Sequence, residues 1–201
     1  MDAPFVYGRI ALDMNYTDRD KETLLLKNNF LNLINTVIIS PRRWGKTSLV
    51  NKVKNELGKE YRKELIICHL DVFNCRSEEH FYKAYSNAIL KTTLSTWEKF
   101  IAGSKKYLGR FAPSVSFSNT AQTFELSFGI DMKEPNLSVD DILDLPQILA
   151  KDLNKKIVVC IDEFQNIHGY ADSLAFQRTL RAHWQTHDKV ATVCMAVNGI
   201  C

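Results

Sequence analysis

Residues 40–48 separate two stretches of the sequence that have different periodicities. The four residues before them, 36–39, are all β-branched, which favours a strand buried on both faces. After them, apolar residues recur at helical spacing over residues 49–57, and Gly58 supplies a helix stop. The order strand, loop, helix over residues 36–58 constrains the fold more than any other feature of the chain.

The loop follows the phosphate-loop pattern G-x-x-x-x-G-K-[ST], with Ser40 in the place of the first glycine. In this pattern, backbone N–H groups at a helix N-terminus converge on phosphate oxygens. Here they belong to residues 44–48, which begin with Trp44 and end with Ser48. Gly45 permits the close approach of the backbone. If the first position needs a positive φ, serine costs on the order of 1 kcal/mol more than glycine there and weakens nucleotide affinity.

Two side chains of the loop predict triphosphate chemistry. The Lys46 ammonium can neutralise β- and γ-phosphates, and the Thr47 hydroxyl is a hard oxygen ligand for Mg²⁺. The alternative is a turn that caps a helix and carries Gly-Lys-Thr by chance, but the position between a strand and an amphipathic helix favours the phosphate loop. We assign these loop residues to the nucleotide site: Ser40, Arg43, Trp44, Gly45, Lys46, Thr47 and Ser48.

Arg42 and Arg43 leave two interpretations open. They either contact nucleic acid or a neighbouring subunit's nucleotide, or they only decorate an exposed loop. The second interpretation is the more common one for a pair of arginines, so the pair alone predicts no partner.

A second apolar run, residues 157–161, ends in Asp162 and Glu163. Two acids at the end of a buried strand are costly unless they face a cation or water. Asp162 would hold the Mg²⁺ shell, directly or through water, and Glu163 would orient the water that attacks the γ-phosphate and accept its proton. By itself the run also fits a solvated strand end. Together with the loop it predicts ATP hydrolysis.

Strands and helices alternate along the rest of the chain. The periodicities predict strands at 65–70, 157–161 and 191–197, and helices at 17–35 (Thr17 as the cap), 78–104, 139–153 and 173–187. Between residues 111 and 131 the period changes to two, which predicts an inserted β-hairpin. The expected fold is therefore an α/β domain spanning residues 1–201, with a mostly parallel sheet between helices. Ligands of such sheets bind beyond the carboxyl ends of the strands.

Composition excludes several classes of protein. The chain of 201 residues is 45% hydrophobic and 24% charged, which is ordinary for a globular domain. Its net charge of +3 does not indicate a nucleic-acid partner. No basic leader or long apolar segment is present, so we expect a cytoplasmic protein without a membrane partner. The five cysteines are odd in number, and we expect reduced thiols in the core.

Two groups of residues that include histidines could be read as metal sites, but a structural role without a metal is favoured for each. Cys68, His69, Cys75 and His80 fit no usual zinc spacing. His183 and His187 lie one helical turn apart without the glutamate of the zinc-protease signature, so we expect a partly exposed helix face.

Residues 40–48, residues 157–165 and the upstream Tyr16-Thr17-Asp18-Arg19-Asp20 together resemble the archaeal-type P-loop ATPases, relatives of AAA+ and STAND proteins. The resemblance covers nearly the whole chain. It implies ATP and Mg²⁺ as cofactors and gives Lys46, Thr47, Asp162 and Glu163 the roles described above. It further implies that Asp18 and Arg19 border the adenine and that Asn198 takes the place of a polar sensor residue.

The resemblance also implies a sheet in which the Walker A strand, residues 36–40, lies between a fifth strand and the sensor strand. The sequence stops at Cys201, just after the strand expected at 191–197, so the fifth strand and the helical lid are expected to be missing. An open edge is then expected at residues 36–40.

Our leading hypothesis is Mg²⁺-dependent ATP binding with hydrolysis. The alternative is an ATP-binding regulatory switch, or a truncated product, with little or no turnover. A nucleic-acid-binding module is a third and weaker hypothesis, and a homo-oligomer or a protein partner stays open.

Overall fold

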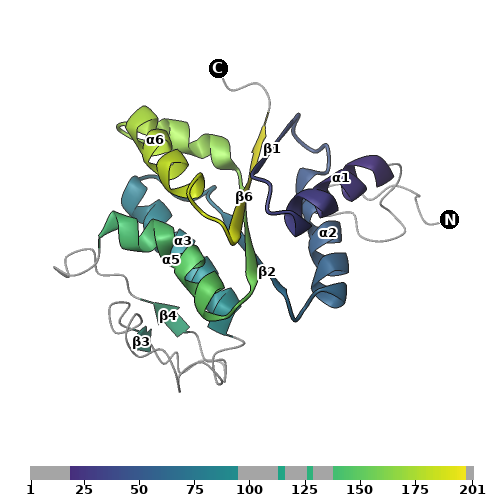
Figure 1. Ribbon diagram of the computed structural model, residues 1–201. Helices are drawn as coiled ribbons and strands as arrows, with labels where there is room; N and C mark the ends of the chain where they lie inside the picture. The colour runs from purple at the N-terminus through teal and green to yellow at the C-terminus, as the bar shows by residue number, and fades with distance from the viewer. Residues whose placement is uncertain (1–18, 95–112, 116–125, 129–137, 198–201) are drawn as a thin grey trace, which may run out of the picture.

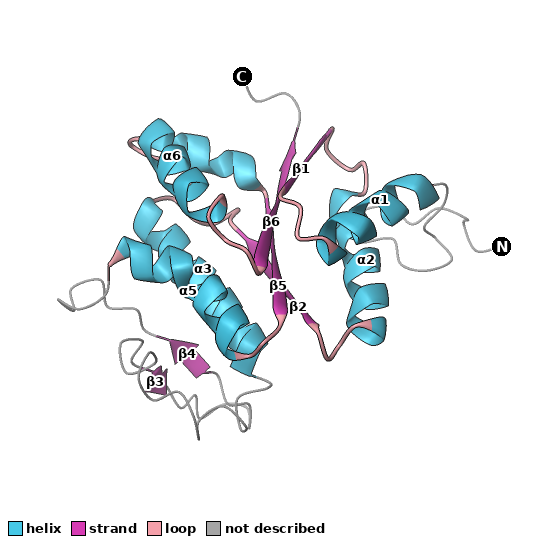
Figure 2. Cartoon of the chain, viewed as in Figure 1, coloured by secondary structure: helices cyan, strands magenta, loops and turns pink. Residues whose placement is uncertain are grey.

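A parallel four-stranded sheet forms the centre of the computed structural model, which describes residues 19–94, 113–115, 126–128 and 138–197 (Figures 1 and 2). The strands are β1 (Thr36–Ser40), β2 (Leu65–Asp71), β5 (Lys156–Asp162) and β6 (Val190–Val197), in the order β1-β6-β5-β2. All three strand pairs are parallel. Parallel neighbours need crossover connections, which is why helices separate the strands in the sequence.

Helices cover both faces of this sheet (Figure 1). One face carries α1 (Asp20–Leu31) and α2 (Lys46–Glu60), and the other carries α3 (Glu78–Leu94), α5 (Val139–Asp152) and α6 (Ser173–Trp184). This arrangement is the predicted α/β sandwich.

The central strand β5 shows why the sequence has continuous apolar runs. Val158 and Cys160 pack into the cluster formed with α1 and α2, whereas Ile157, Val159 and Ile161 pack into the cluster formed with α3, α5 and α6. Each fully buried aliphatic side chain contributes about 1.5–3 kcal/mol. A strand covered on both faces therefore needs apolar residues at every position.

In the part of the chain that the structure describes, strand β1 lies at the open edge that the resemblance implies, and it is less buried than its composition predicts. Its β-branched residues predict burial on both faces, but Val37 is 65% exposed and Ile39 is 62% exposed. Among the described residues, β1 pairs with β6 alone and lies at the edge of the sheet. The side chains on its α6 side therefore stay open to solvent.

Several helix ends also differ from the sequence expectation. Helix α1 begins at Asp20 with Arg19 at the N-cap, and Thr17, the expected cap, lies outside the described residues. Gly58 was wrong as the helix stop, because α2 continues through it to Glu60. The buried Leu57 holds that last turn against the core, and this packing outweighs the low helix propensity of glycine.

The segment between α3 and α5 holds two short strands. These are β3 (Pro113–Val115) and β4 (Leu126–Phe128), which pair antiparallel as in the predicted hairpin. The rest of the expected hairpin and the expected end of the helix at 78–104 lie outside the described residues.

The cores hold the described cysteines. Cys68, Cys75, Cys160 and Cys194 are buried and free, as expected of reduced core thiols. In the described ranges, no helix is both long enough and apolar enough to cross a membrane.

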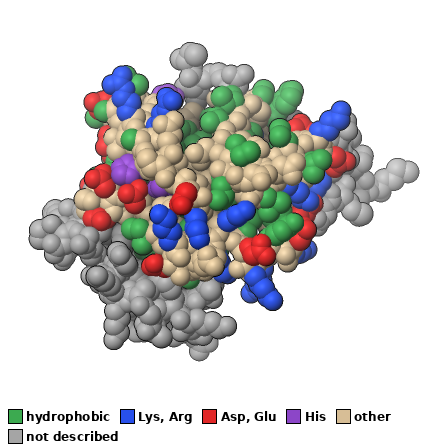
Figure 3. Space-filling view, viewed as in Figure 1, with side chains coloured by type: hydrophobic (Ala, Val, Ile, Leu, Met, Phe, Trp, Pro, Cys, Tyr) green, Lys and Arg blue, Asp and Glu red, His purple; other side chains and the backbone are tan. Residues whose placement is uncertain are grey.

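A histidine and aspartate cluster joins α5 to the end of α6. His183 Nδ1 and His187 Nε2 lie 2.8 and 3.1 Å from the same oxygen of Asp144, and His183 Nε2 lies 3.1 Å from Asp140 Oδ1. Histidine and acidic side chains meet on this side of the molecule (Figure 3). His187 follows α6 rather than extending it, and its side chain is 2% exposed, so a partly exposed face was wrong for this residue.

Candidate nucleotide site

The loop between β1 and α2 makes its turn through two residues with left-handed backbone angles. Arg43 has φ +65° and Gly45 has φ +72°. Ser40 belongs to β1 and does not adopt a positive φ. The strain considered for serine in the first glycine's place therefore does not arise, and the glycine that the backbone requires is Gly45.

The Lys46 side chain lies inside this loop. It is only 7% exposed, and its Nζ donates to Ser40 O at 3.2 Å and to Pro41 O at 3.5 Å. A lysine is seldom buried unless its ammonium is paired. Here the partners are two backbone carbonyls of the loop, so a positive charge is held at the start of α2.

Thr47 and Asp162, 115 positions apart in the sequence, meet at the carboxyl ends of the strands. Thr47 Oγ1 donates to Asp162 Oδ2 at 2.7 Å, and Asp162 Oδ1 accepts from the Glu163 backbone N–H at 2.9 Å. Hydroxyl and carboxylate oxygens are the donors that Mg²⁺ takes in proteins. Over the described part of the chain, no three His, Cys, Asp or Glu side chains are arranged to hold a metal ion, so a cation here would need phosphate and water oxygens as well.

Glu163 begins a short 3₁₀ helix, η3 (Phe164–Gly169), which periodicity did not predict. Its backbone is left-handed, with φ +54°, and its carboxylate accepts a hydrogen bond from Gln165 Nε2. Gln165 is a site residue that sequence reasoning missed. The signal for it was its place in the Asp-Glu-Phe-Gln run, but the contact that buries it is tertiary.

Arg19 reaches the loop from the start of α1. Its Nη1 donates to Trp44 O at 2.8 Å, and its Nε pairs with Glu22 Oε1 at 3.3 Å. The Trp44 side chain is exposed beside it, as are Arg42 and Arg43. Asp18 and Asn198, the other residues that the resemblance assigns to the nucleotide, lie outside the described residues.

A further carboxylate lies at the carboxyl ends of the strands. Asp71 ends β2 directly beside Asp162 in the strand register. On the same strand, burial lowers the pKa of His69 despite the nearby Asp162 charge. The position of Asp71 follows from the rule that strand ends carry ligand-binding residues, but the strand order that makes it a neighbour of Asp162 was not readable from periodicity.

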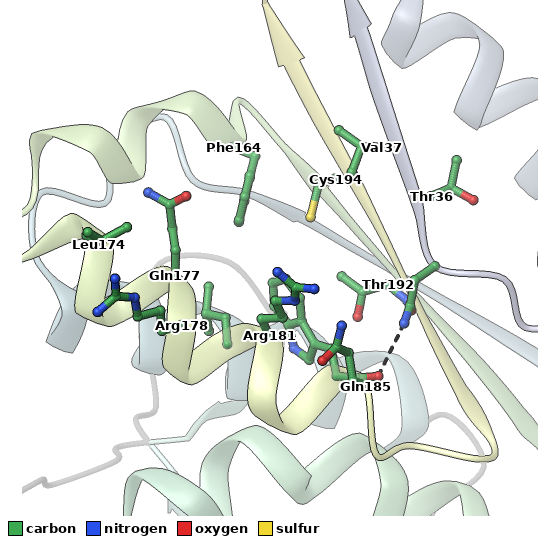
Figure 4. A pocket seen from close by; sticks show the side chains of 13 residues that line it. Thr36, Val37, Phe164, Leu174, Gln177, Arg178, Arg181, Gln185, Thr192 and Cys194 are labelled. Carbon is green, nitrogen blue, oxygen red and sulfur yellow. Dashed lines mark hydrogen bonds between the residues drawn. The ribbon is translucent and has the colours of Figure 1, made fainter.

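The described surface also has a hollow of about 480 Å³, which is not this site. It lies between α6 and the first halves of β1 and β6, and its lining includes Arg178 and Arg181 of α6, Val37 of β1 and Cys194 of β6 (Figure 4). None of its lining residues belongs to the phosphate loop. At its end, Asn35 Nδ2 donates to Trp184 O at 3.2 Å.

Comparison with known proteins decides the family. The family model described as the KAP family P-loop domain matches residues 43–170, which is more than half of the chain. The chain belongs to the KAP family of P-loop NTPase domains. The P-loop ATPase family and fold predicted from the sequence are thereby confirmed. No curated protein matches the sequence.

Solved structures share the fold of this KAP domain. The Walker-type ATPase of Pyrococcus abyssi superposes with a TM-score of 0.57 at 17% identity, over 96% of this chain and 49% of that one. The Aeropyrum pernix ORC2 protein in ADPNP–ADP complexes gives 0.57 at 16% identity, over 96% and 44%. The Aeropyrum pernix ORC1 protein in complex with DNA gives 0.53 at 11%, over 90% and 39%. This chain spans half or less of the length of these structures.

Proposed function

We propose that this KAP domain binds MgATP at residues 40–48 and hydrolyses it, as an ATPase of the AAA+ and STAND-related type. The observation that carries the proposal is the 2.7 Å hydrogen bond between Thr47 and Asp162. This bond joins the sequence neighbours of Lys46 and Glu163, which supports the proposal that phosphate binding, cation binding and water activation share the carboxyl end of the sheet.

Each side chain has a stated task in this proposal. Lys46, already directed into the loop, exchanges its carbonyl partners for phosphate oxygens. Thr47 and Asp162 contribute oxygens to Mg²⁺, which when bound neutralises charge on the β- and γ-phosphates. Glu163 orients the attacking water and takes its proton, a contribution worth about 10²–10⁴-fold in rate.

A second candidate is an ATP-binding switch with little turnover. The observation in its favour is that the Glu163 carboxylate is already engaged by Gln165. If this hydrogen bond keeps the carboxylate away from the attacking water, ATP is hydrolysed slowly. Cytoplasmic location and a protein or homo-oligomeric partner are part of the proposal for either candidate.

Two variants separate the candidates when binding is measured by calorimetry and hydrolysis by steady-state phosphate release. Lys46→Ala removes a charged hydrogen-bonding partner of phosphate, so we expect MgATP affinity about 10- to 100-fold below wild type. Glu163→Gln keeps the size of the side chain but cannot take a proton, so we expect wild-type affinity and phosphate release slowed by about 10²-fold or more.

The outcomes are distinct for each hypothesis. The switch is favoured over the ATPase if wild type and Glu163→Gln release phosphate at the same background rate and MgATP binding is lost only in Lys46→Ala. A wild-type chain that binds no MgATP would contradict both. Steeply salt-dependent DNA affinity would instead favour a nucleic-acid-binding module.

A further inference from the structure

Gln165 is an amide placed where an apolar residue would be expected. It lies in η3, is 8% exposed and stands close behind Asp162 and Glu163. A buried amide costs free energy unless its hydrogen bonds are made. Both ends of this one are used: Nε2 donates to Glu163 Oε2, and Oε1 accepts from the Val197 backbone N–H at 3.1 Å.

The backbone around Glu163 adds to the constraint on this side chain. Its φ of +54° is a left-handed angle that is unfavourable for a non-glycine residue. The turn is held because the Glu163 N–H donates to Asp162 Oδ1. With the backbone fixed from one side, the hydrogen bond from Gln165 fixes the carboxylate from the other. Such strain is kept at sites where direction matters.

The other partner of Gln165 ties this carboxylate to the strand beside the phosphate loop. Val197 ends the described part of β6 and pairs with Ser40, the residue at which β1 passes into the loop. The amide of Gln165 therefore bridges the carboxylate of Glu163 and the end of the strand that flanks the loop.

We infer that Gln165 is the positioning residue for Glu163. Its hydrogen bond orients the Glu163 carboxylate and couples that orientation to the position of the end of β6. The inference rests on the proposed ATPase function. A displacement of a reacting group by about 1 Å can cost about 10²-fold in rate. Loss of the bridge should therefore lower kcat while nucleotide binding at Lys46 and Thr47 is kept.

Two substitutions separate the effects of the two hydrogen bonds that Gln165 makes. Gln165→Met keeps the volume of the side chain and removes both bonds. Gln165→Glu keeps an acceptor for the Val197 N–H but places a second carboxylate against Glu163. A purely structural tie between η3 and β6 would survive in Gln165→Glu, whereas the positioning role would not.

The test is a double-mutant cycle of Gln165→Met and Glu163→Gln, measured as kcat and KM for MgATP and as single-turnover phosphate release so that slow variants stay measurable. We expect both Gln165 variants to lose 10- to 100-fold in kcat with KM within about twofold of wild type. We expect Gln165→Met to change nothing further once Glu163 is Gln, because it acts through Glu163.

Each other result overturns a stated part. Full kcat in Gln165→Met or in Gln165→Glu, or an equal loss on both Glu163 backgrounds, overturns the positioning role and leaves the ATPase proposal standing. Wild-type release no faster than that of Lys46→Ala, or release unaffected by Glu163→Gln, overturns the ATPase proposal and the inference with it. If Gln165→Met does not fold, Gln165→Glu decides, since it retains the bond to β6.

Discussion

At the scale of single residues, backbone geometry and phosphate charge dictate which residue types the phosphate loop can hold. Gly45 adopts a left-handed angle, Lys46 turns inward, and Thr47 faces Asp162. Residue types demanded by backbone geometry or by phosphate charge can be recognised one by one. Gln165 could not be found in this way, since its role comes from contact with the end of β6, 32 positions away.

The loop angles predict different effects on MgATP binding for two glycine exchanges. Gly45→Ala forces a side chain onto φ +72°, although its Cβ would meet nothing closer than 3.8 Å, so we expect a loss of about 1 kcal/mol in stability and weaker MgATP binding. Ser40→Gly restores the motif but relieves no strain, because Ser40 lies in β1.

For Ser40→Gly we expect unchanged MgATP affinity, measured by calorimetry. We expect its free energy of unfolding, measured by chemical denaturation, to be lower by about 0.5–1 kcal/mol. Tenfold tighter binding by Ser40→Gly would show that the first loop position does require glycine.

At the scale of elements, the types of helix and strand followed from periodicity, but their ends followed from packing. Phe81, Tyr85 and Ile89 recur at helical spacing along α3, and all three are buried. The end of α2 was misplaced because propensity at Gly58 is weaker than the burial of Leu57. The 3₁₀ helix η3 has no periodic signature, since one short turn is set by local hydrogen bonds.

The histidine and aspartate cluster between α5 and the end of α6 predicts that the stability of the fold decreases in acid. Burial lowers the pKa of His187, and this outweighs the attraction of Asp144. For Asp144, burial opposes ionisation, but hydrogen bonds from His183 and His187 outweigh it and lower its pKa. The His187 contribution is complete above its unfolded pKa of about 6.5 and is lost as pH falls toward the folded value. The Asp144 contribution is lost only below its unfolded pKa of about 3.8.

We therefore expect the free energy of unfolding to fall between pH 7.5 and 5.5 more steeply in wild type than in His187→Gln. The limit for one proton is about 1.4 kcal/mol per pH unit. Urea denaturation at several pH values measures this, with His168→Gln at an exposed histidine of η3 as the control. Parallel curves for wild type and His187→Gln would exclude His187 as the source.

At the scale of the whole molecule, alternating strands and helices predicted the parallel sheet, and the resemblance implied only that β1 lies next to β6. Periodicity alone cannot give strand order, because every buried strand reads alike. It also misjudged β1, whose apolar side chains at Val37 and Ile39 are exposed at the sheet edge. An apolar edge strand favours pairing with another chain.

We expect this edge to drive self-association of the chain. Val37→Lys places a charge at the edge and should lower the apparent mass of the protein at tens of micromolar, measured by light scattering after size exclusion. The matched control is Leu25→Lys, which charges a similarly exposed residue on α1 away from the edge. A monomeric wild type, or equal effects of the two variants, would contradict this expectation.

The central claim is that Thr47, Asp162 and Glu163 meet to hydrolyse ATP bound by the loop. The most direct measurement is single-turnover release of labelled phosphate, with enzyme in excess over MgATP, for wild type, Glu163→Gln and Lys46→Ala. We expect release by wild type, release about 10²-fold or more slower by Glu163→Gln despite full nucleotide binding, and no release by Lys46→Ala at concentrations that saturate wild type. Equal rates for wild type and Glu163→Gln would contradict the claim.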